Sequence, residues 1–469
     1  MKHLPPRKQL SRRHFIATTG LAALAAPTIL TGCASAGGRR RAPSERITLG
    51  VVGWGMMGPS NTHAFLDLPD CQVVAACDLD KNHLAGAVNT INQHYGNQDC
   101  AAYHDFRELM ARRDIDAVML AVPDHWHALV AVEAAKHGKD IYGEKPLAKT
   151  IAEQQAIVRA VHKHKVIWQT GSWQRSVANF HKAAEIVRNG MIGKVTHVEV
   201  GLPAGHHDFA GTEPAFLQKL SGLPEKITSP AQVLPGTDAW KLSASTPPPE
   251  LDYDFWIGPS QMEDYIQARV HMNWRWNYNT GGGQLMDWVG HHCDIAHWGM
   301  GFDYNGPSEI EGHGEFPDPK AVWNTCTKYR IELQYPQNIT MTMAGGHADI
   351  RSGTKWIGTD GWVWVDRGGF DASNPEWKDW KYVPDELRKV KLIKSSNHQR
   401  NFIESVKSRK PTITPAEVAH HSTIPGHLGL ISMLVGRKIR WSVAKEVILG
   451  DPEASKLLSR GFRSPWHLG

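Results

Sequence analysis

Short apolar runs alternate with segments of helical periodicity between residues 46 and 170. The predicted strands are Ile47–Val52, Gln72–Cys77, Asp116–Val122, Asp140–Tyr142 and Val166–Gln169. Between them, segments such as Ala128–His137 and Ile151–His162 repeat apolar residues with the period of an α-helix. Continuous Val, Ile and Ala runs that alternate with helices are typical of a parallel sheet covered on both faces. The pattern predicts a doubly wound α/β domain over residues 46–170.

The pattern changes beyond that domain. Residues 203–280 are rich in Pro, Gly and Trp, and loops this long are uncommon unless they build a binding site. A helix is predicted at Gly283–Met300, followed by runs rich in Val, Thr and aromatic residues that predict an open mixed or antiparallel sheet. These runs are Thr327–Gln334, Asn338–Ala344 and the Trp-rich turn Lys355–Asp366, and later helices are predicted at Asn397–Lys410 and Pro425–Ile439. We therefore expect a second α/β domain over residues 171–469.

The first 45 residues are typical of an export signal and tether. Arg12 and Arg13 lie in a segment that resembles the twin-arginine signal, and the apolar stretch Leu21–Leu30 after it is too short to span a membrane. Leu30–Cys33 then resembles a bacterial lipobox, in which the cysteine is acylated. Each piece alone can arise by chance, but their order predicts export. The exported protein is then expected either in the periplasm or as a lipoprotein that contacts a membrane only through a lipid on Cys33.

Charge and cysteine content narrow the function classes. Residues 1–46 hold nine Lys and Arg and one acidic residue, so the segment carries +8 and the remainder carries −3 of the total of +5. A slightly acidic body offers no broad basic surface, which argues against nucleic acid as a partner. Besides Cys33, five cysteines remain, and an odd number excludes a fully paired disulfide framework.

A glycine motif follows the first predicted strand. Gly53, Gly55 and Gly58, with Met56 and Met57 between them, have the spacing that lets a pyrophosphate approach the backbone at a helix N-terminus. Asp78 ends the second strand, 20 positions beyond Gly58, where a carboxylate accepts the ribose hydroxyls and disfavours a 2′-phosphate. The combination predicts NAD as the cofactor, with NADP possible; the alternative for Asp78 is a solvated turn residue.

Two further groups of residues can carry chemistry. Lys145, in the segment Gly143–Pro146, follows a strand of the predicted sheet, and ligands bind at the carboxyl ends of such strands. Asp287 and His291 are one helical turn apart, so a carboxylate can orient an imidazole that acts as a general base. Nearby His and Asp side chains raise the alternative of zinc, but no dedicated ligand set accompanies them and we expect no metal.

These motifs resemble the Gfo/Idh/MocA family, named for glucose–fructose oxidoreductase, inositol 2-dehydrogenase and a rhizopine-catabolism protein. Seven segments carry the resemblance in family order, at residues 50–58, 121–128, 138–150, 169–176, 252–259, 274–298 and 398–410. The resemblance implies a Rossmann domain, a second α/β domain with an open sheet, a tightly held cofactor and a homo-oligomer, either a dimer or a tetramer. It also implies hydride transfer between a carbohydrate CH–OH and nicotinamide.

Residue by residue, the resemblance implies that Lys145, Asp287 and His291 are catalytic. It places one group of residues near the cofactor, namely Pro123, His125, His127 and, by the nicotinamide ribose, Glu144. It places Gln174 and Arg175 near the substrate crevice. One position departs from the family pattern, because Val289 occupies a place where relatives commonly have glycine and Gly290 follows it.

The tryptophan content favours a carbohydrate substrate. The chain has 18 tryptophans, and those around Trp274 and Arg275 can provide flat apolar faces for sugar rings, although some must belong to the core. Two alternatives stay open beside the sugar or polyol dehydrogenase. One is a glycosidase or lyase that oxidises its substrate transiently without net change of NAD, and the other is a non-catalytic sugar-binding lipoprotein.

Overall fold

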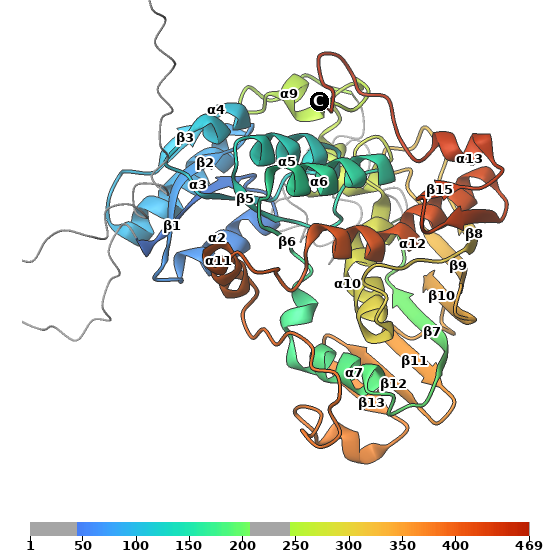
Figure 1. The fold of residues 1–469 in the computed structure, drawn as a ribbon. Coiled ribbons are helices and arrows are strands. Elements are labelled where there is room, and N and C mark those ends of the chain that lie inside the picture. Colours follow the sequence, from blue (N-terminus) through green and yellow to red (C-terminus); the bar gives the residue numbers. More distant parts are fainter. Residues whose placement is uncertain (1–44, 207–243, 469) are drawn as a thin grey trace, which may run out of the picture. The chain divides into compact units, whose positions relative to one another are not determined.

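The computed structural model describes residues 45–206 and 244–468 (Figure 1). The export signal, the lipobox and nearly all of the tether lie outside the described residues, so those predictions stay predictions. No helix within the described ranges is long and apolar enough to cross a membrane.

The first domain is built on a parallel six-stranded sheet. Its strands are β1 (Ile47–Val52), β2 (Cys71–Cys77), β3 (Ala101–Tyr103), β4 (Ala117–Leu120), β5 (Asp140–Gly143) and β6 (Trp168–Thr170), in the order β3-β2-β1-β4-β5-β6. All the pairs are parallel. The chain order reverses between β1 and β4, and in open α/β sheets ligands bind at such a switch point. The doubly wound fold is confirmed.

Helices connect these strands. They are α2 (Met57–Leu66), α3 (Lys81–Tyr95), α4 (Phe106–Ala111), α5 (His127–Lys136) and α6 (Ile151–His164). Local chemistry sets three of their starts, because Asp80 caps α3, Asp105 caps α4 and Thr150 caps α6 through side-chain oxygens that accept backbone N–H bonds. The strand β3 was not predicted, because its three residues, of which Ala102 is exposed, are too few to show a periodic pattern.

The second domain contains a nine-stranded sheet in the order β13-β12-β11-β7-β10-β9-β8-β14-β15 (Figure 1). Its strands are β7 (Val195–Leu202), β8 (Glu309–Glu315), β9 (Lys328–Tyr335), β10 (Ile339–Gly345), β11 (Gly353–Gly358), β12 (Trp362–Asp366), β13 (Gly369–Ala372), β14 (Ile439–Ser442) and β15 (Val447–Ile448). Only β7 and β10 pair in parallel, which confirms the mixed sheet. The Trp-rich segment 355–366 forms most of the β11–β12 hairpin.

Helices cover one face of this sheet. The predicted helix α10 (Gly283–Met300) is confirmed, and with α7 (Ala178–Arg188) and α12 it packs on the strands around a core that includes Val289, Met341 and Trp356. Helix α12 spans Ala416–Val435, so the prediction of a helix starting at Pro425 was nine residues late. A proline is expected in the first turn of a helix, but packing of the buried segment before it extends α12 toward the N-terminus.

The C-terminal part of the chain also supports the first domain. Helix α11 (His398–Ser408) agrees with its prediction, and Phe402, Ile403 and Val406 belong to the same apolar core as Leu49 and Phe65. Residues from both sides of the predicted domain boundary therefore share one hydrophobic core. The boundary at residue 170 stays a prediction.

Candidate functional site

A cavity that opens to solvent, with about 990 Å³ of empty space including the open part, lies at the carboxyl ends of β1, β2, β4 and β5. Its walls come from the glycine loop, from the loops after β2 and β4, and from the segment of residues 251–275 in the second domain. That segment includes α9 (Tyr253–Ile257) and the short helical turns Gln267–Arg269 and His271–Trp276.

The glycine loop has the geometry that a pyrophosphate requires. Gly53 has a positive φ of 93°, and a Cβ there would lie 2.5 Å from the carbonyl oxygen of Ala121. A Cβ on Gly58 would lie 2.3 Å from the carbonyl oxygen of Gly53, whereas a Cβ on Gly55 would meet nothing within 4 Å. Gly53 and Gly58 are therefore needed for the turn, and Gly55 leaves open space beside the N-terminus of α2, where phosphate binding is favourable.

Asp78 lines the same cavity, directly after the end of β2, as the sequence predicted. Its carboxylate accepts hydrogen bonds from the backbone N–H of Trp54 at 2.6 Å and of Asp80 at 2.9 Å. Each oxygen keeps a second lone pair that a ribose hydroxyl can use. Burial raises the pKa of Asp78, although nearby His83 and the two N–H bonds oppose that shift. The loop, the helix end and the carboxylate together fit the phosphates and ribose of NAD.

Two residues of the cavity lining, Lys145 and Arg275, share a carboxylate that does not itself line the cavity, and the three side chains form an ion cluster. The ammonium of Lys145 donates to the Oδ1 of Asp287 at 2.8 Å and to its carbonyl oxygen at 2.9 Å, and Nε of Arg275 donates to the same Oδ1 at 3.0 Å. Burial opposes ionisation of Asp287, but the two cations outweigh it and hold the pKa of that carboxyl well below its usual range. A Cβ on Gly290 would lie 3.1 Å from the Cβ of Lys145. This small residue lets α10 approach the lysine closely.

His291 lies on the same face of α10 as Asp287, but the expected pairing of the two side chains is not found among the described residues. No hydrogen bond joins it to Asp287 among the described contacts, because the carboxylate is taken by the two cations, which are the stronger donors. Burial, then Lys145 and Arg367, lowers the pKa of His291 well below its ordinary value, so the imidazole is neutral near pH 7. Its Nδ1 is buried without a partner among the described residues.

An aromatic wall stands beside His291. The rings of Trp173 and Trp288 lie 6.3 and 5.5 Å from the imidazole. The guanidinium of Arg367 packs over both tryptophans, at 4.9 and 4.3 Å from their ring centroids. Sequence reasoning missed Trp173 and Arg367, because the contacts arise only when β12 and its following turn are brought to α10.

A buried acid and a buried amine also escaped prediction. Asp124 follows β4, and its Oδ1 has no hydrogen-bond partner among the described residues. Burial raises the pKa of Asp124 and lowers the pKa of Lys149, whose ammonium donates to the carbonyl oxygen of Gly281 at 2.8 Å. Arg275, Asp287 and Lys145 also affect the pKa of Asp124, so it belongs to the electrostatic surroundings of the ion cluster. Its position after a strand of the sheet was the available signal.

The structure brings most of the sequence-predicted residues to the cavity. Those that line it are Gly53, Gly55, Met56, Met57, Asp78, Pro123, His127, Glu144, Lys145, Trp274 and Arg275. Within this set, Oε1 of Glu144 accepts a hydrogen bond from Asn61 at 2.7 Å. The cation–π pair of Trp274 and Arg275 has a separation of 4.3 Å.

Six other predicted residues are not part of the cavity lining: Gly58, Asp287 and His291, whose contacts are given above, and His125, Gln174 and Arg175. His125 is fully buried and its Nε2 contacts the carbonyl oxygen of Trp256 at 2.9 Å. Gln174 is fully buried between His292 and Arg367. The Arg175 side chain is 2% exposed, and it is bound by the carboxylates of Asp294 and Asp303. Direct contact of His125, Gln174 and Arg175 with cofactor or substrate stays a prediction that the geometry does not favour.

The fold and the cavity define the class: proteins that bind NAD on a Rossmann domain and cover it with a second α/β domain. The chain belongs to the Gfo/Idh/MocA oxidoreductase family. The family model described as the NAD-binding Rossmann fold matches residues 47–172, and the model of the C-terminal alpha/beta domain matches residues 235–468. The resemblance inferred from the sequence is confirmed, and so is NAD as the cofactor of the first domain.

Individual relatives are more distant. The chain is 30% identical over 172 residues to the inositol 2-dehydrogenase of Salmonella paratyphi B, an alignment that covers 36% of this chain and 48% of that protein. It is 26% identical over 215 residues to a glycosyl hydrolase family 109 protein of Shewanella pealeana, covering 41% of this chain and 45% of that protein. These alignments span less than half of either relative. The crystal structure of the WlbA dehydrogenase of Bordetella pertussis, in complex with NADH and UDP-GlcNAcA, superimposes with a TM-score of 0.58 at 15% identity, covering 85% of this chain and 99% of that one. That likeness shows the fold.

Proposed function

We propose that this protein is an NAD-dependent oxidoreductase that acts on a CH–OH group of a sugar, a sugar derivative or a polyol. The observation that carries the proposal is the ion cluster of Lys145, Asp287 and Arg275 near a neutral His291, with Lys145 and Arg275 lining the dinucleotide cavity. A binding protein gains little from burying one carboxylate between two cations, because desolvation of the charges is costly.

The residues divide the chemistry between them. NAD, when bound, supplies the hydride acceptor, and oxidation of the CH–OH group releases one hydride and one proton to leave a carbonyl. Neutral His291 can accept the hydroxyl proton, because its lowered pKa keeps a lone pair available near pH 7. Lys145, fixed by Asp287, is positioned to donate a hydrogen bond to the substrate oxygen. The walls of Trp173 and Trp288 offer flat apolar faces of the kind that sugar rings contact.

The first experiment separates binding from chemistry. The protein is purified from the cytoplasm, any bound dinucleotide is identified by mass spectrometry, and nicotinamide absorbance is followed as sugars, polyols and glycosides are added. We expect the Lys145→Ala variant to keep the cofactor and lose turnover. Lys182→Ala is the matched control, because Lys182 is also buried and donates only to backbone carbonyls of Trp377 and Lys378. A protein that neither contains nor binds a dinucleotide refutes the proposal.

A second candidate is the redox-neutral glycosidase. The similarity to the glycosyl hydrolase family 109 protein favours it, and an enzyme outside the cytoplasm has no free pool of NAD to draw on. The two candidates differ in one measurement. Release of an aglycone with no net change in nicotinamide absorbance identifies the glycosidase, whereas net reduction of NAD by one class of sugar or polyol identifies the dehydrogenase.

We further propose that the protein is exported through the segment of residues 1–45, with a tightly held NAD and, if Cys33 is acylated, a lipid anchor. Folding before export would let the chain acquire its cofactor in the cytoplasm. We also propose a homo-oligomer that uses the exposed face of the nine-stranded sheet. Light scattering of the purified protein and mass spectrometry of the mature N-terminus test these two points.

A further inference from the structure

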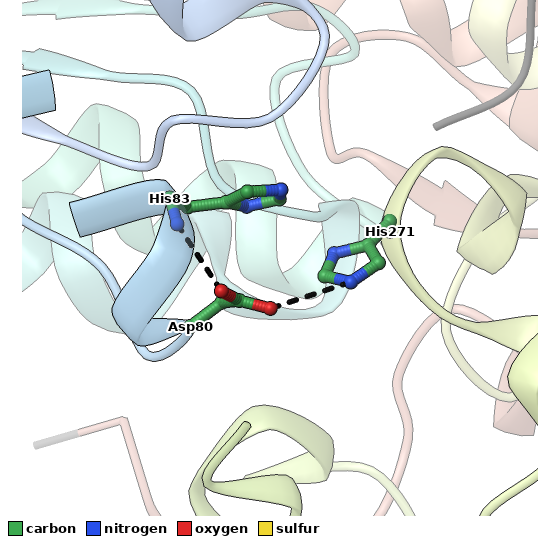
Figure 2. A group of neighbouring side chains, drawn as sticks. All are labelled: Asp80, His83 and His271. Atoms are coloured by element: carbon green, nitrogen blue, oxygen red, sulfur yellow. Dashed lines mark hydrogen bonds and ion pairs between the residues drawn. The ribbon is translucent and has the colours of Figure 1, made fainter. Parts of the chain in front are cut away.

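Three side chains with metal-binding atoms meet at the rim of the cavity. They are Asp80 and His83, at the start of α3, and His271, in the segment that crosses from the second domain (Figure 2). One ligand atom from each lies within 4.8 Å of the other two. Two imidazoles and one carboxylate form a ligand set that zinc and similar divalent ions accept, with a fourth position left for water.

The contacts of Asp80 leave one of its oxygens available. Oδ1 accepts the backbone N–H groups of Asn82 and His83, at 2.8 and 3.1 Å, and so caps α3. Oδ2 lies 3.5 Å from Nε2 of His271, and no hydrogen bond holds it. An N-cap alone requires only Oδ1. The carboxylate is therefore oriented by the helix, with its second oxygen directed toward His271 (Figure 2).

The position of His271 is unusual for a residue that only packs. Its φ is 53°, in the left-handed region that side chains other than glycine seldom adopt. The imidazole lies 4.5 Å from that of His83, measured between ring centroids, and the His271 side chain is 20% exposed. The strained backbone directs this imidazole to His83 and Asp80, and strain of this kind is found at functional sites more often than elsewhere.

The three ligands connect segments that are distant in the sequence. Residues 250–252 already bind the loop after β2, through hydrogen bonds from Lys81 N–H to the Glu250 carbonyl at 3.0 Å and from Asp252 N–H to the Leu79 carbonyl at 3.2 Å. These contacts stop before His271, so a metal ion would extend the same attachment along the cavity rim. Zinc bonds of about 2.0–2.2 Å place tetrahedral ligand atoms about 3.5 Å apart. Separations of up to 4.8 Å must therefore contract by at most about 1.3 Å, which rotation of the two imidazoles can provide.

We propose that Asp80, His83 and His271 bind one divalent transition-metal ion of the zinc type, which fastens the segment of residues 250–276 to the first domain at the mouth of the cavity. The role at a cofactor cavity rests on the proposed function, but the binding of the ion does not. A bound ion would restrain a wall of the cavity and slow the exchange of any ligand enclosed there.

Cobalt binding tests the site. The full chain is treated with a chelator, dialysed and titrated with Co²⁺, whose visible absorption reports its ligands, and Zn²⁺ is then added as a competitor. The test variant is His271→Gly, because glycine accepts a positive φ and the change removes a ligand without straining the backbone. The matched control is His104→Ala, since His104 also lines the cavity but pairs with Asp252 at 2.8 Å.

We expect one Co²⁺ per chain, displaced by Zn²⁺. His271→Gly should weaken binding by more than the roughly 10- to 100-fold that loss of an outer partner costs at metal sites, and His104→Ala should leave it unchanged. Absence of saturable binding, or equal affinity in the His271→Gly variant, overturns the proposal. The absorption is read without substrate or NAD. An inactive enzyme that still binds Co²⁺ at this site would therefore refute only the proposed function and would leave the metal site standing.

Hydrogen exchange tests the fastening. Amides of residues 250–276 should exchange at least several-fold more slowly with Zn²⁺ than without it, and the difference should vanish in His271→Gly. Bound Zn²⁺ that leaves exchange in this segment unchanged would refute the bridging role.

Discussion

Replacement of Asp287 by asparagine should expose how strongly the ion cluster is coupled. The change keeps the shape of the side chain but removes the charge that Lys145 and Arg275 share, and the side chains of all three are 7–16% exposed. At a Lys145–Asp287 separation of 2.8 Å, an effective dielectric constant of about 20 gives roughly 6 kcal/mol of attraction before desolvation. Breaking comparable buried pairs costs about 3–5 kcal/mol, and we expect about 3, because the amide oxygen still accepts a hydrogen bond.

A double-mutant cycle isolates this coupling. Lys145→Met should cost less, about 1–2 kcal/mol, because Asp287 keeps Arg275 as its partner. The double variant should then be about 2 kcal/mol more stable than the sum of the two losses predicts, measured by chemical denaturation of the NAD-free protein at pH 7.5. Additivity within about 0.5 kcal/mol would mean that the pair does not form in solution, and would refute the reasoning.

The same variant should lower turnover. Loss of a positioned charge in proton-transfer chemistry costs about 10²- to 10⁴-fold, so we expect kcat/KM of Asp287→Asn to fall within that range. Asp303→Asn is the control, because Asp303 binds buried Arg175 at 2.8 Å away from the cavity and Arg175 keeps Asp294. Equal losses of activity in both variants would attribute the effect to general destabilisation.

Three further predictions concern other parts of the structure. Asp78→Ala should reduce the preference for NAD over NADP, measured as the ratio of their dissociation constants, because the carboxylate lines the ribose wall; an unchanged ratio would mean that another residue selects. Arg175→Met should lower stability by about 3 kcal/mol or more with little change in KM, since its guanidinium binds Asp294 rather than the cavity; a raised KM with intact stability would restore it to the substrate site. Burial lowers the pKa of His398 to about 4, so its contribution to stability is complete above about pH 6.5 and is lost as the pH falls toward 4. Between pH 7.5 and 5, the free energy of unfolding of the His398→Gln variant should therefore fall by about 2 kcal/mol less than that of the wild type. Equal decreases would mean that His398 is not buried and neutral.

The sequence predicted those features that depend on local spacing. The strand–glycine–helix unit at Gly53–Gly58 and the Asp78 that follows β2 both have fixed separations along the chain, and the structure brings them to one wall. The mixed sheet was also predicted, because its strands carry their own apolar and β-branched patterns. The start of α12 escaped, since burial by distant segments, rather than local composition, determines it, and β3 escaped because three residues are too few to show a pattern.

The site was predicted less completely than the fold. Spacing correctly placed Asp287 and His291 on one helical face, but it could not show which group the carboxylate would bind. That choice depends on Lys145, 142 positions away, and on Arg275. Arg175 illustrates the converse, because a motif position suggested substrate contact while the fold surrounds the side chain with Asp294 and Asp303.

The competition for Asp287 changes the expected division of labour. An imidazole hydrogen-bonded to a carboxylate is stabilised as the cation, whereas His291 faces the positive charges of Lys145 and Arg367, which favour its neutral form. The contacts with Asp287, in turn, hold the Lys145 side chain in place. The neutral acceptor His291 and the donor Lys145 therefore lie near one another, as oxidation of an alcohol requires. In this arrangement Asp287 acts mainly on the lysine, and its removal should harm catalysis by misplacing a hydrogen-bond donor, even while His291 stays neutral.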